Sequence, residues 1–186
     1  TGLTTSVRPE ELNGDQALGL FLNTLPLCVQ LKGGTWVELI AQVFAAEREL
    51  LDVRYYPLAS LQRLQGGNAL FDTTFNYLNY YVGESLLNSD QLKITQWDEP
   101  SQSNFTLDVT FNLEVGTQTV ELILQGDKDW LDQHQLQRIG DYYIRALSEI
   151  AADPSKRYDA DSLMSTTERK QLITEWQGIE ADYPRE

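Results

Sequence analysis

The sequence is poor in the residues on which many catalytic and metal sites depend. Its 186 residues contain one cysteine, Cys28, and one histidine, His134. One sulfur forms neither an intrachain disulfide nor a thiolate cluster, and one imidazole excludes a histidine-rich zinc site, so we expect no metal. Cys28 lies in an apolar run, which predicts a buried, unreactive thiol. His134 lies at the polar start of an expected helix, and no motif places a serine or carboxylate beside it, so we predict no catalytic role.

Positive charge is also scarce. The chain has 14 Lys and Arg against 28 Asp and Glu, a net charge of −14 with histidine neutral. Binding to nucleic acid depends on clustered basic side chains, and no such cluster is present, so a nucleic-acid partner is excluded. No apolar stretch approaches the roughly 20 residues that span a bilayer, and the first residues lack the pattern of a signal peptide. The sequence therefore predicts no membrane partner and a cytoplasmic location.

What is present is the hydrophobic pattern of a chain with both strands and helices. The strongest signal is the alternation of apolar and polar residues from Phe105 to Val115, followed by a turn and a second alternating run, which predicts an antiparallel hairpin. Further strands are expected at 3–7, within 19–31, within 70–81 and, as an edge strand, at 92–97. Helices are expected at about 36–53, 58–64 and 133–152. This order favours an α/β (α+β) sandwich.

Two helix starts carry the spacing of a capping box, in which a hydroxyl and a carboxylate each satisfy a free amide. Thr35 and Glu38 begin the helix expected at 36–53, and Ser165 and Glu168 begin a short one. The longer helix is expected to turn one apolar stripe inward: Val37, Ile40, Val43 or Phe44, Glu47 and Leu51. The short helix is expected to carry Leu172, Ile173 and Trp176.

The residues alone nominate no catalytic group. The sequence has neither a glycine-rich phosphate loop nor a Gly-x-Ser-x-Gly nucleophile turn. Two amides lie in apolar surroundings, Asn23 within 20–31 and Asn76 between Phe75 and Tyr77. A buried amide without partners costs about 1–3 kcal/mol, so each is expected to bond to backbone groups or to a polar ligand. Both alternatives stay open at this point.

Five segments in the same order resemble motifs of the condensation domain of nonribosomal peptide synthetases. The residues Gly19 to Leu27, GLFLNTLPL, are similar to the G-L-F-V-N-T-L-P-L stretch of that family, and this intact stretch fits condensing members better than epimerising ones. Two departures are Val7, where the family has glycine, and Cys28, where it usually has arginine. The other four segments are Thr5-Ser6-Val7-Arg8-Pro9 with Leu12 and Gly14, Tyr56-Pro57-Leu58 with Leu61-Gln62, Leu70-Phe71-Asp72-Thr73 with Phe75 and Asn76, and Leu163-Met164-Ser165 with Glu168-Arg169, Trp176 and Tyr183-Pro184.

The resemblance covers the second half of that family's domain. It implies one lobe of a two-lobed chloramphenicol-acetyltransferase-like fold, a mixed sheet with flanking helices, severed within a strand near Thr1. Residues 1–155 would form the C-terminal lobe and residues 156–186 the linker towards an adenylation domain. The family joins a carrier-bound acyl or peptidyl thioester to a carrier-bound aminoacyl amine. Its H-H-x-x-x-D-G motif, which carries the candidate base, is absent here, so the isolated chain is expected to be inactive.

Carried over by position, Ser6, Asn23 and Thr24 match residues near the family's substrate tunnel, where they would orient substrate without exchanging protons. No catalytic residue and no directly bound cofactor are implied, because the phosphopantetheine arms belong to partner carrier proteins. The implied partners are the N-terminal lobe of the same domain, peptidyl carrier proteins and an adenylation domain. The alternative function is a non-catalytic module that docks carrier proteins or self-associates through the exposed lobe interface. A complete small acyl-CoA transferase would need a histidine base that this sequence lacks.

Overall fold

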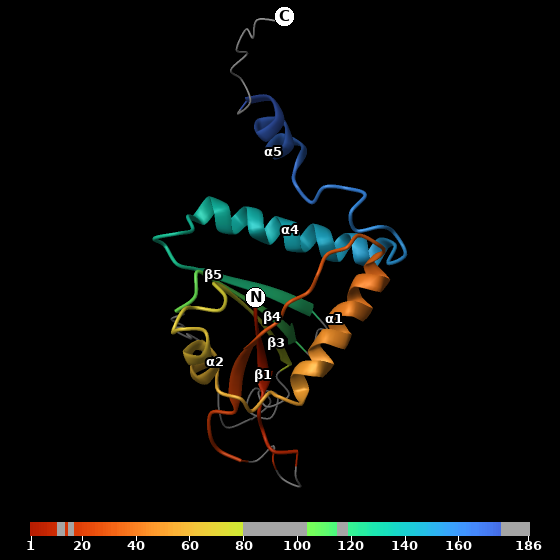
Figure 1. Ribbon diagram of the computed structural model, residues 1–186. Coiled ribbons are helices and arrows are strands. Elements are labelled where there is room, and N and C mark those ends of the chain that lie inside the picture. The colour runs from red at the N-terminus through yellow and green to blue at the C-terminus, as the bar shows by residue number, and fades with distance from the viewer. Residues whose placement is uncertain (11–13, 15–16, 80–103, 115–118, 176–186) are drawn as a thin grey trace, which may run out of the picture. The chain divides into compact units, whose positions relative to one another are not determined.

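The computed structural model describes residues 1–10, 14, 17–79, 104–114 and 119–175. The chain divides into two compact units, which we call the sheet unit (Thr1–Gln30 and Ala41–Gly140) and the clasp unit (Leu31–Ile40 and Asp141–Glu186). The strands are β1 (Gly2–Ser6), β2 (Leu22–Pro26), β3 (Thr73–Asn79), β4 (Leu107–Glu114) and β5 (Thr119–Gly126). The helices are α1 (Trp36–Leu51), α2 (Leu58–Leu64), α4 (Gln133–Ala152), α5 (Thr166–Lys170) and the π-helix η2 (Gln171–Glu175) (Figure 1).

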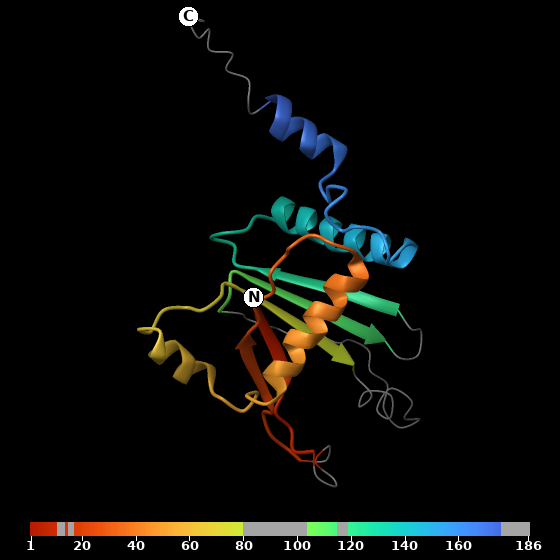
Figure 2. The same cartoon turned by 45° about the vertical axis from the view of Figure 1, so that its right-hand side comes forward.

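The sheet unit contains one five-stranded mixed sheet in the order β2-β1-β3-β4-β5 (Figure 2). β3 runs parallel to both β1 and β4, whereas the β1–β2 and β4–β5 pairs are antiparallel. This confirms the predicted mixed sheet with flanking helices and the predicted hairpin. The strands expected at 3–7, within 19–31 and within 70–81 are also present. The edge strand expected at 92–97 lies outside the described residues.

One face of the sheet is apolar and holds most of the core. The strand register places the side chains of Leu3, Leu25, Phe75, Val109 and Leu124 on this face. Leu25 is 1 % and Val109 2 % exposed. The first turns of α4 cover the β5 side of this face. A Cβ placed on Gly126 would meet Leu136 of α4 at 2.8 Å, and one on Gly140 would meet Leu124 at 3.5 Å.

Helix α1 begins at the predicted residue with the predicted cap and ends at Leu51, two residues before the predicted end. Of the stripe expected to face inward, Val43 alone is among the more buried residues. Thr35 Oγ1 accepts from the backbone N–H of Glu38, and Glu38 Oε2 accepts from that of Thr35, which confirms the capping box. The apolar residues expected to face inward, Val37, Ile40, Phe44 and Leu51, are between 42 % and 59 % exposed, and Glu47 is exposed as well. The more buried positions are Trp36, Leu39, Val43, Ala46 and Leu50. Both stripes are largely apolar at helical spacing, so periodicity alone did not choose between them.

In the clasp unit, the turn before α1 is bound to the segment that follows α4. We call this set of contacts between 33–36 and 154–158 the clasp. Thr35 and Arg157 form an antiparallel bridge, and the backbone N–H of Tyr158 donates to the carbonyl of Gly34. The Tyr158 hydroxyl accepts from the backbone N–H of Gly33 at 2.7 Å, and its ring lies 5.8 Å from that of Trp36. Gly33 has φ +78°, a left-handed conformation that favours glycine.

The clasp unit also fixes α5 against the second half of α4. The Ser165–Glu168 capping box is present as predicted, and the same Glu168 carboxylate accepts a hydrogen bond from the Tyr142 hydroxyl. The guanidinium of Arg145 donates to the carbonyl of Leu163 at 2.7 Å. Trp176 lies outside the described residues. The helix predicted at 133–152 is confirmed, whereas the domain boundary at residue 155 stays a prediction.

Candidate functional site

The second face of the sheet is lined by polar side chains, which is unusual for a face built from central strands. Residues paired in register point to the same side of a sheet, and side chains alternate along each strand. We call this surface the polar face. The register places on it Thr4 and Ser6 of β1, Thr24 of β2, Thr74 and Asn76 of β3, and Asp108, Thr110 and Asn112 of β4. Three apolar residues, Leu22, Leu78 and Ile123, also lie on this face.

Two of the three predicted site residues, Ser6 and Thr24, lie on this polar face. Ser6 is the last residue of β1, is exposed, and its Oγ accepts from the backbone N–H of Arg8 at 3.3 Å. Thr24 is half-buried, and its Oγ1 lies 3.5 Å from that of Thr4, its partner across the strands. Each hydroxyl can both donate and accept, so this end of the polar face offers hydrogen bonds without a charge.

The third predicted site residue, Asn23, lies on the opposite face of the sheet. Its register partner is Thr5, so it shares the apolar face with Leu25. Its Nδ2 donates to the carbonyls of Arg54 and Tyr56, both at 2.8 Å. Both amide hydrogens are therefore used to hold the connection between α1 and α2. Of the two alternatives left open by the sequence, the structure supports bonding to the backbone, and the tunnel role of Asn23 stays a prediction.

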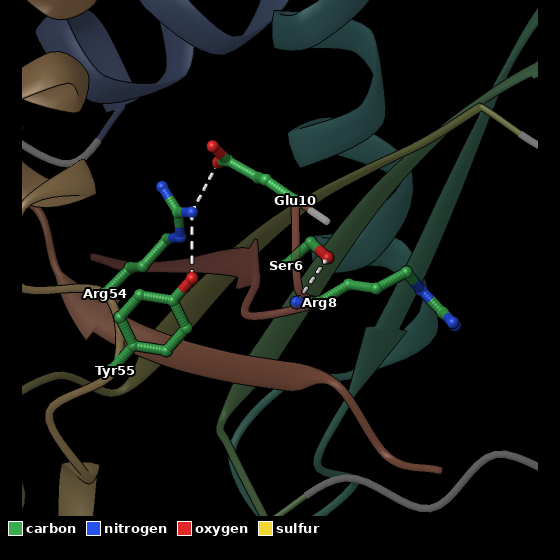
Figure 3. A network of polar contacts seen from close by, with 5 residues as sticks. All are labelled: Ser6, Arg8, Glu10, Arg54 and Tyr55. Atoms are coloured by element: carbon green, nitrogen blue, oxygen red, sulfur yellow. Dashed lines mark hydrogen bonds and ion pairs between the residues drawn. The ribbon is translucent and has the colours of Figure 1, made fainter. Parts of the chain in front are cut away.

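The connection held by Asn23 carries a charged network that the sequence did not suggest (Figure 3). Arg54 binds Glu10, with 2.5 Å between Nη2 and Oε1, and donates from the same nitrogen to the Tyr55 hydroxyl at 3.0 Å. The hydrogen bond to Tyr55, followed by that to Glu10, raises the pKa of the Arg54 guanidinium. These contacts tie the segment after β1 to the segment after α1. No sequence motif indicates the Arg54–Glu10 pair, because the two residues are far apart in the chain.

Two polar groups of this face are shielded from solvent, whereas Asn76, Asp108 and Thr110 are half-buried. Thr74 is 4 % exposed. The Oδ1 atom of Asn112 is buried and accepts no hydrogen bond within the described part of the chain. A buried acceptor without a donor costs free energy that a bound donor would recover. A donor on a bound polar group could therefore satisfy this acceptor.

Of the remaining sequence candidates, Cys28 and His134 lie outside the sheet and Asn76 lies on the polar face. Cys28 is exposed, so the expectation of a buried thiol is wrong. It lies two residues beyond the end of β2, where the chain leaves the sheet, and the apolar run therefore did not imply burial. His134 is exposed in the first turn of α4, as expected for the polar start of a helix. Asn76 lies on the polar face and is half-buried.

Metal-binding and membrane-spanning features are both missing from the described residues. Over the ranges given above, no group of three or more His, Cys, Asp or Glu is arranged to hold a metal ion. No helix in the described part of the chain is both long and apolar enough to cross a membrane.

Sequence comparison points to one family over most of the chain. Residues 1–173 match the family model described as "Condensation domain". One of the linear gramicidin synthase proteins of Brevibacillus parabrevis is 29 % identical over 191 residues, which cover 100 % of this chain and 2 % of that protein. Chondramide synthase cmdD of Chondromyces crocatus is 27 % identical, over 94 % of this chain and 4 % of that protein. The chain thus spans only a small part of these relatives.

Solved structures show the same fold. The starter condensation domain of rhizomide synthetase RzmA superposes with a TM-score of 0.68 at 21 % identity, over 88 % of this chain and 39 % of that one. The first condensation domain of the calcium-dependent antibiotic synthetase, solved with a substrate analogue, gives a TM-score of 0.67 at 17 % identity, over 88 % and 36 %. The five-stranded sheet and its helices therefore match part of each of these domains.

Proposed function

Because the chain belongs to the condensation-domain family of nonribosomal peptide synthetases, and is a fragment of such a domain, we propose that it forms the acceptor-side, C-terminal lobe. In this role it supplies one wall of the tunnel in which a carrier-bound acyl or peptidyl thioester meets a carrier-bound aminoacyl amine. The N-terminal lobe of the same domain supplies the other wall. The chain covers 36–39 % of the solved domains quoted above, which leaves room for a second lobe.

The observation that carries this proposal is the polar face of the sheet. The opposite face is largely apolar and its β5 side is covered by α4, so the polar face is better suited to a polar substrate. Ser6, at the exposed end of β1, offers a hydroxyl there, and Thr24 lies on the neighbouring strand. These groups orient the acceptor amine or the pantetheine amides by hydrogen bonds, which lowers the cost of bringing the reactants together.

The reaction itself needs a proton acceptor from outside this chain. The amine nitrogen attacks the thioester carbon, the new C–N bond forms, the C–S bond breaks, and the amine proton ends on the released pantetheine thiol. The single histidine of the sequence is exposed at the start of α4, and the H-H-x-x-x-D-G motif is absent. The polar face therefore positions substrate, and the base belongs to the N-terminal lobe.

The partners follow from this role. Two peptidyl carrier proteins bring the substrates on phosphopantetheine arms, and the chain itself holds no cofactor. Residues 156–186 lead towards an adenylation domain. The contacts of Arg157 and Tyr158 with 33–36 support an anchored start for this linker.

The proposal is tested by reconstitution. This chain, a separately produced N-terminal lobe with the H-H-x-x-x-D-G motif and both loaded carrier proteins are mixed, and the amide product is measured by mass spectrometry. We expect product only when both lobes are present. Ser6→Ala should lower the rate about threefold to tenfold, the value of one neutral hydrogen bond. Thr5→Ala, next to Ser6 but on the apolar face, is the matched control. Product from this chain alone would overturn the proposal.

A further inference from the structure

Strand β5 is the outermost described strand on one side of the sheet. It pairs with β4 along all of Thr119–Gly126, and within the described ranges no strand pairs with its other side. Soluble proteins usually protect such an edge with lysine, proline, a bulge or a very short strand. β5 has eight residues, contains no Lys, Arg or Pro, and carries a single charge, Glu121. The other edge strand, β2, has five residues and ends at Pro26.

Large apolar side chains are exposed along this open edge. Val120 is 53 % and Ile123 39 % exposed. Trp130, in the turn that follows β5, is 72 % exposed. Val120 shares the apolar face with Leu122 and Leu124, whereas Ile123 is on the polar face. From Val120 to Gly126 the edge therefore offers main-chain groups that no described strand pairs with, and apolar side chains on both faces.

We propose that β5 is a dimerisation edge that pairs antiparallel with β5 of a second copy of this chain, around a two-fold axis at Ile123. In this register Ile123 lies opposite its own copy, Leu122 opposite Leu124, and Glu121 opposite Gln125. Apolar residues meet apolar residues, and the one charge meets an amide that can donate to it. Val120 lies opposite Gly126, at the end of the strand where Trp130 of the second copy follows.

The neighbouring registers are less favourable. A shift by two residues places the carboxylate of Glu121 opposite Ile123, which pairs a charge with an exposed apolar side chain. A shift by one residue would place apolar-face residues of one copy opposite polar-face residues of the other. Regular antiparallel pairing disfavours this register, because residues opposite each other point to the same side of the sheet. The sequence of β5 therefore selects the register centred on Ile123.

Net charge opposes this dimer and makes it sensitive to salt. Each copy carries −14, so two copies repel each other over distances that salt screens. One pair of strands also buries less surface than the roughly 1,600 Å² of a standard protein interface. We therefore expect a reversible dimer that becomes tighter as the salt concentration rises, the reverse of an association driven by opposite charges.

The test uses the self-pairing of position 123 in the 186-residue chain. Analytical ultracentrifugation over a concentration series should show a dimer for the unchanged chain. Ile123→Lys and Ile123→Glu each place like charges opposite each other and should weaken association at least about tenfold. An equal mixture of the two variants should associate more tightly than either alone. Leu22→Lys, an exposed apolar residue on the other edge strand, is the control and should leave association unchanged.

A second variant tests the register by a gain of affinity. Gln125→Lys places a cation opposite Glu121 of the second copy and should tighten the dimer severalfold. Circular dichroism establishes that each variant is folded before its association is compared. The proposal is overturned if the unchanged chain stays monomeric at all concentrations and salt levels, or if the mixture gains nothing over the single variants. Tighter association of Ile123→Lys alone would also overturn it, because that result requires Glu121 opposite position 123.

Discussion

Replacing Asn23 tests whether its amide is a structural link between β2 and the connection that follows α1. Two hydrogen bonds of 2.8 Å join Nδ2 to the carbonyls of Arg54 and Tyr56. A neutral hydrogen bond contributes about 0.5–1.5 kcal/mol to stability. The bond to Tyr56 is exposed, so water replaces it readily, whereas the one to Arg54 is partly buried. We expect Asn23→Ala to lower the free energy of unfolding by about 1–2 kcal/mol.

Asn23→Asp separates a lost hydrogen bond from a repulsive contact. At pH 7 the carboxylate only accepts hydrogen bonds, so it faces two carbonyl oxygens without a proton to share. We expect Asn23→Asp to be less stable than Asn23→Ala at pH 7, by about 1 kcal/mol. Near pH 4 and below, protonation supplies one donor, so this difference should shrink. Comparing the two variants at each pH removes the general effect of acid.

The assay is urea unfolding followed by circular dichroism, analysed for the free energy of unfolding. Asn68→Ala is the matched control, because its Nδ2 makes one long, exposed bond of 3.4 Å to the Gln65 carbonyl. We expect Asn68→Ala to change the free energy of unfolding by less than about 0.5 kcal/mol. Equal effects of the changes at Asn23 and Asn68 would refute the reasoning, as would an aspartate variant as stable as the alanine variant at pH 7.

The cap of α1 and the packing of α4 give two further predictions. Thr35→Ala removes the cap and should cost about 1 kcal/mol in thermal or urea unfolding. The hydrogen bond from the Thr35 backbone lowers the pKa of Glu38, so its contribution to stability is full above the ordinary value of 4.5 and is lost as the pH falls through the lower folded value. Glu38→Gln should therefore flatten the acid limb of the stability curve, and an unchanged limb would contradict this. Gly126→Ala places a methyl 2.8 Å from a Leu136 methyl and should cost about 1–3 kcal/mol, whereas Gly140→Ala, with its nearest contact at 3.5 Å, should be neutral or stabilising.

Local patterns in the sequence predicted most of the sheet and helices. The alternation from Phe105 onward indicated the β4–β5 hairpin, and the spacing of Thr35 and Glu38 indicated the start of α1. The prediction of which side of α1 is buried was largely wrong, because two adjacent stripes along the helix are both largely apolar. The stripe that turns inward includes Trp36, whose ring lies 5.8 Å from that of Tyr158, a contact between segments far apart in the chain.

The placement of the candidate site residues depends on strand register, which the sequence pattern does not give. The resemblance to condensation domains placed Ser6 and Asn23, with Thr24 beside Asn23, near one substrate tunnel. Adjacent strand residues point to opposite faces, so Asn23 and Thr24 are separated by the sheet itself. The Arg54–Glu10 pair joins two connections, and no pattern of charge or hydropathy along the chain indicates it.

The clasp also bears on how the chain is made. During synthesis Trp36 leaves the ribosome long before Tyr158, so the indole has no aromatic neighbour until the intervening strands and α4 have been translated. Closing so long a loop is entropically expensive, and contacts formed earlier among β1 to β5 shorten the effective distance between its ends. A nascent chain stalled before residue 158 would lack both this ring contact and the hydrogen bond from the Gly33 backbone to the Tyr158 hydroxyl.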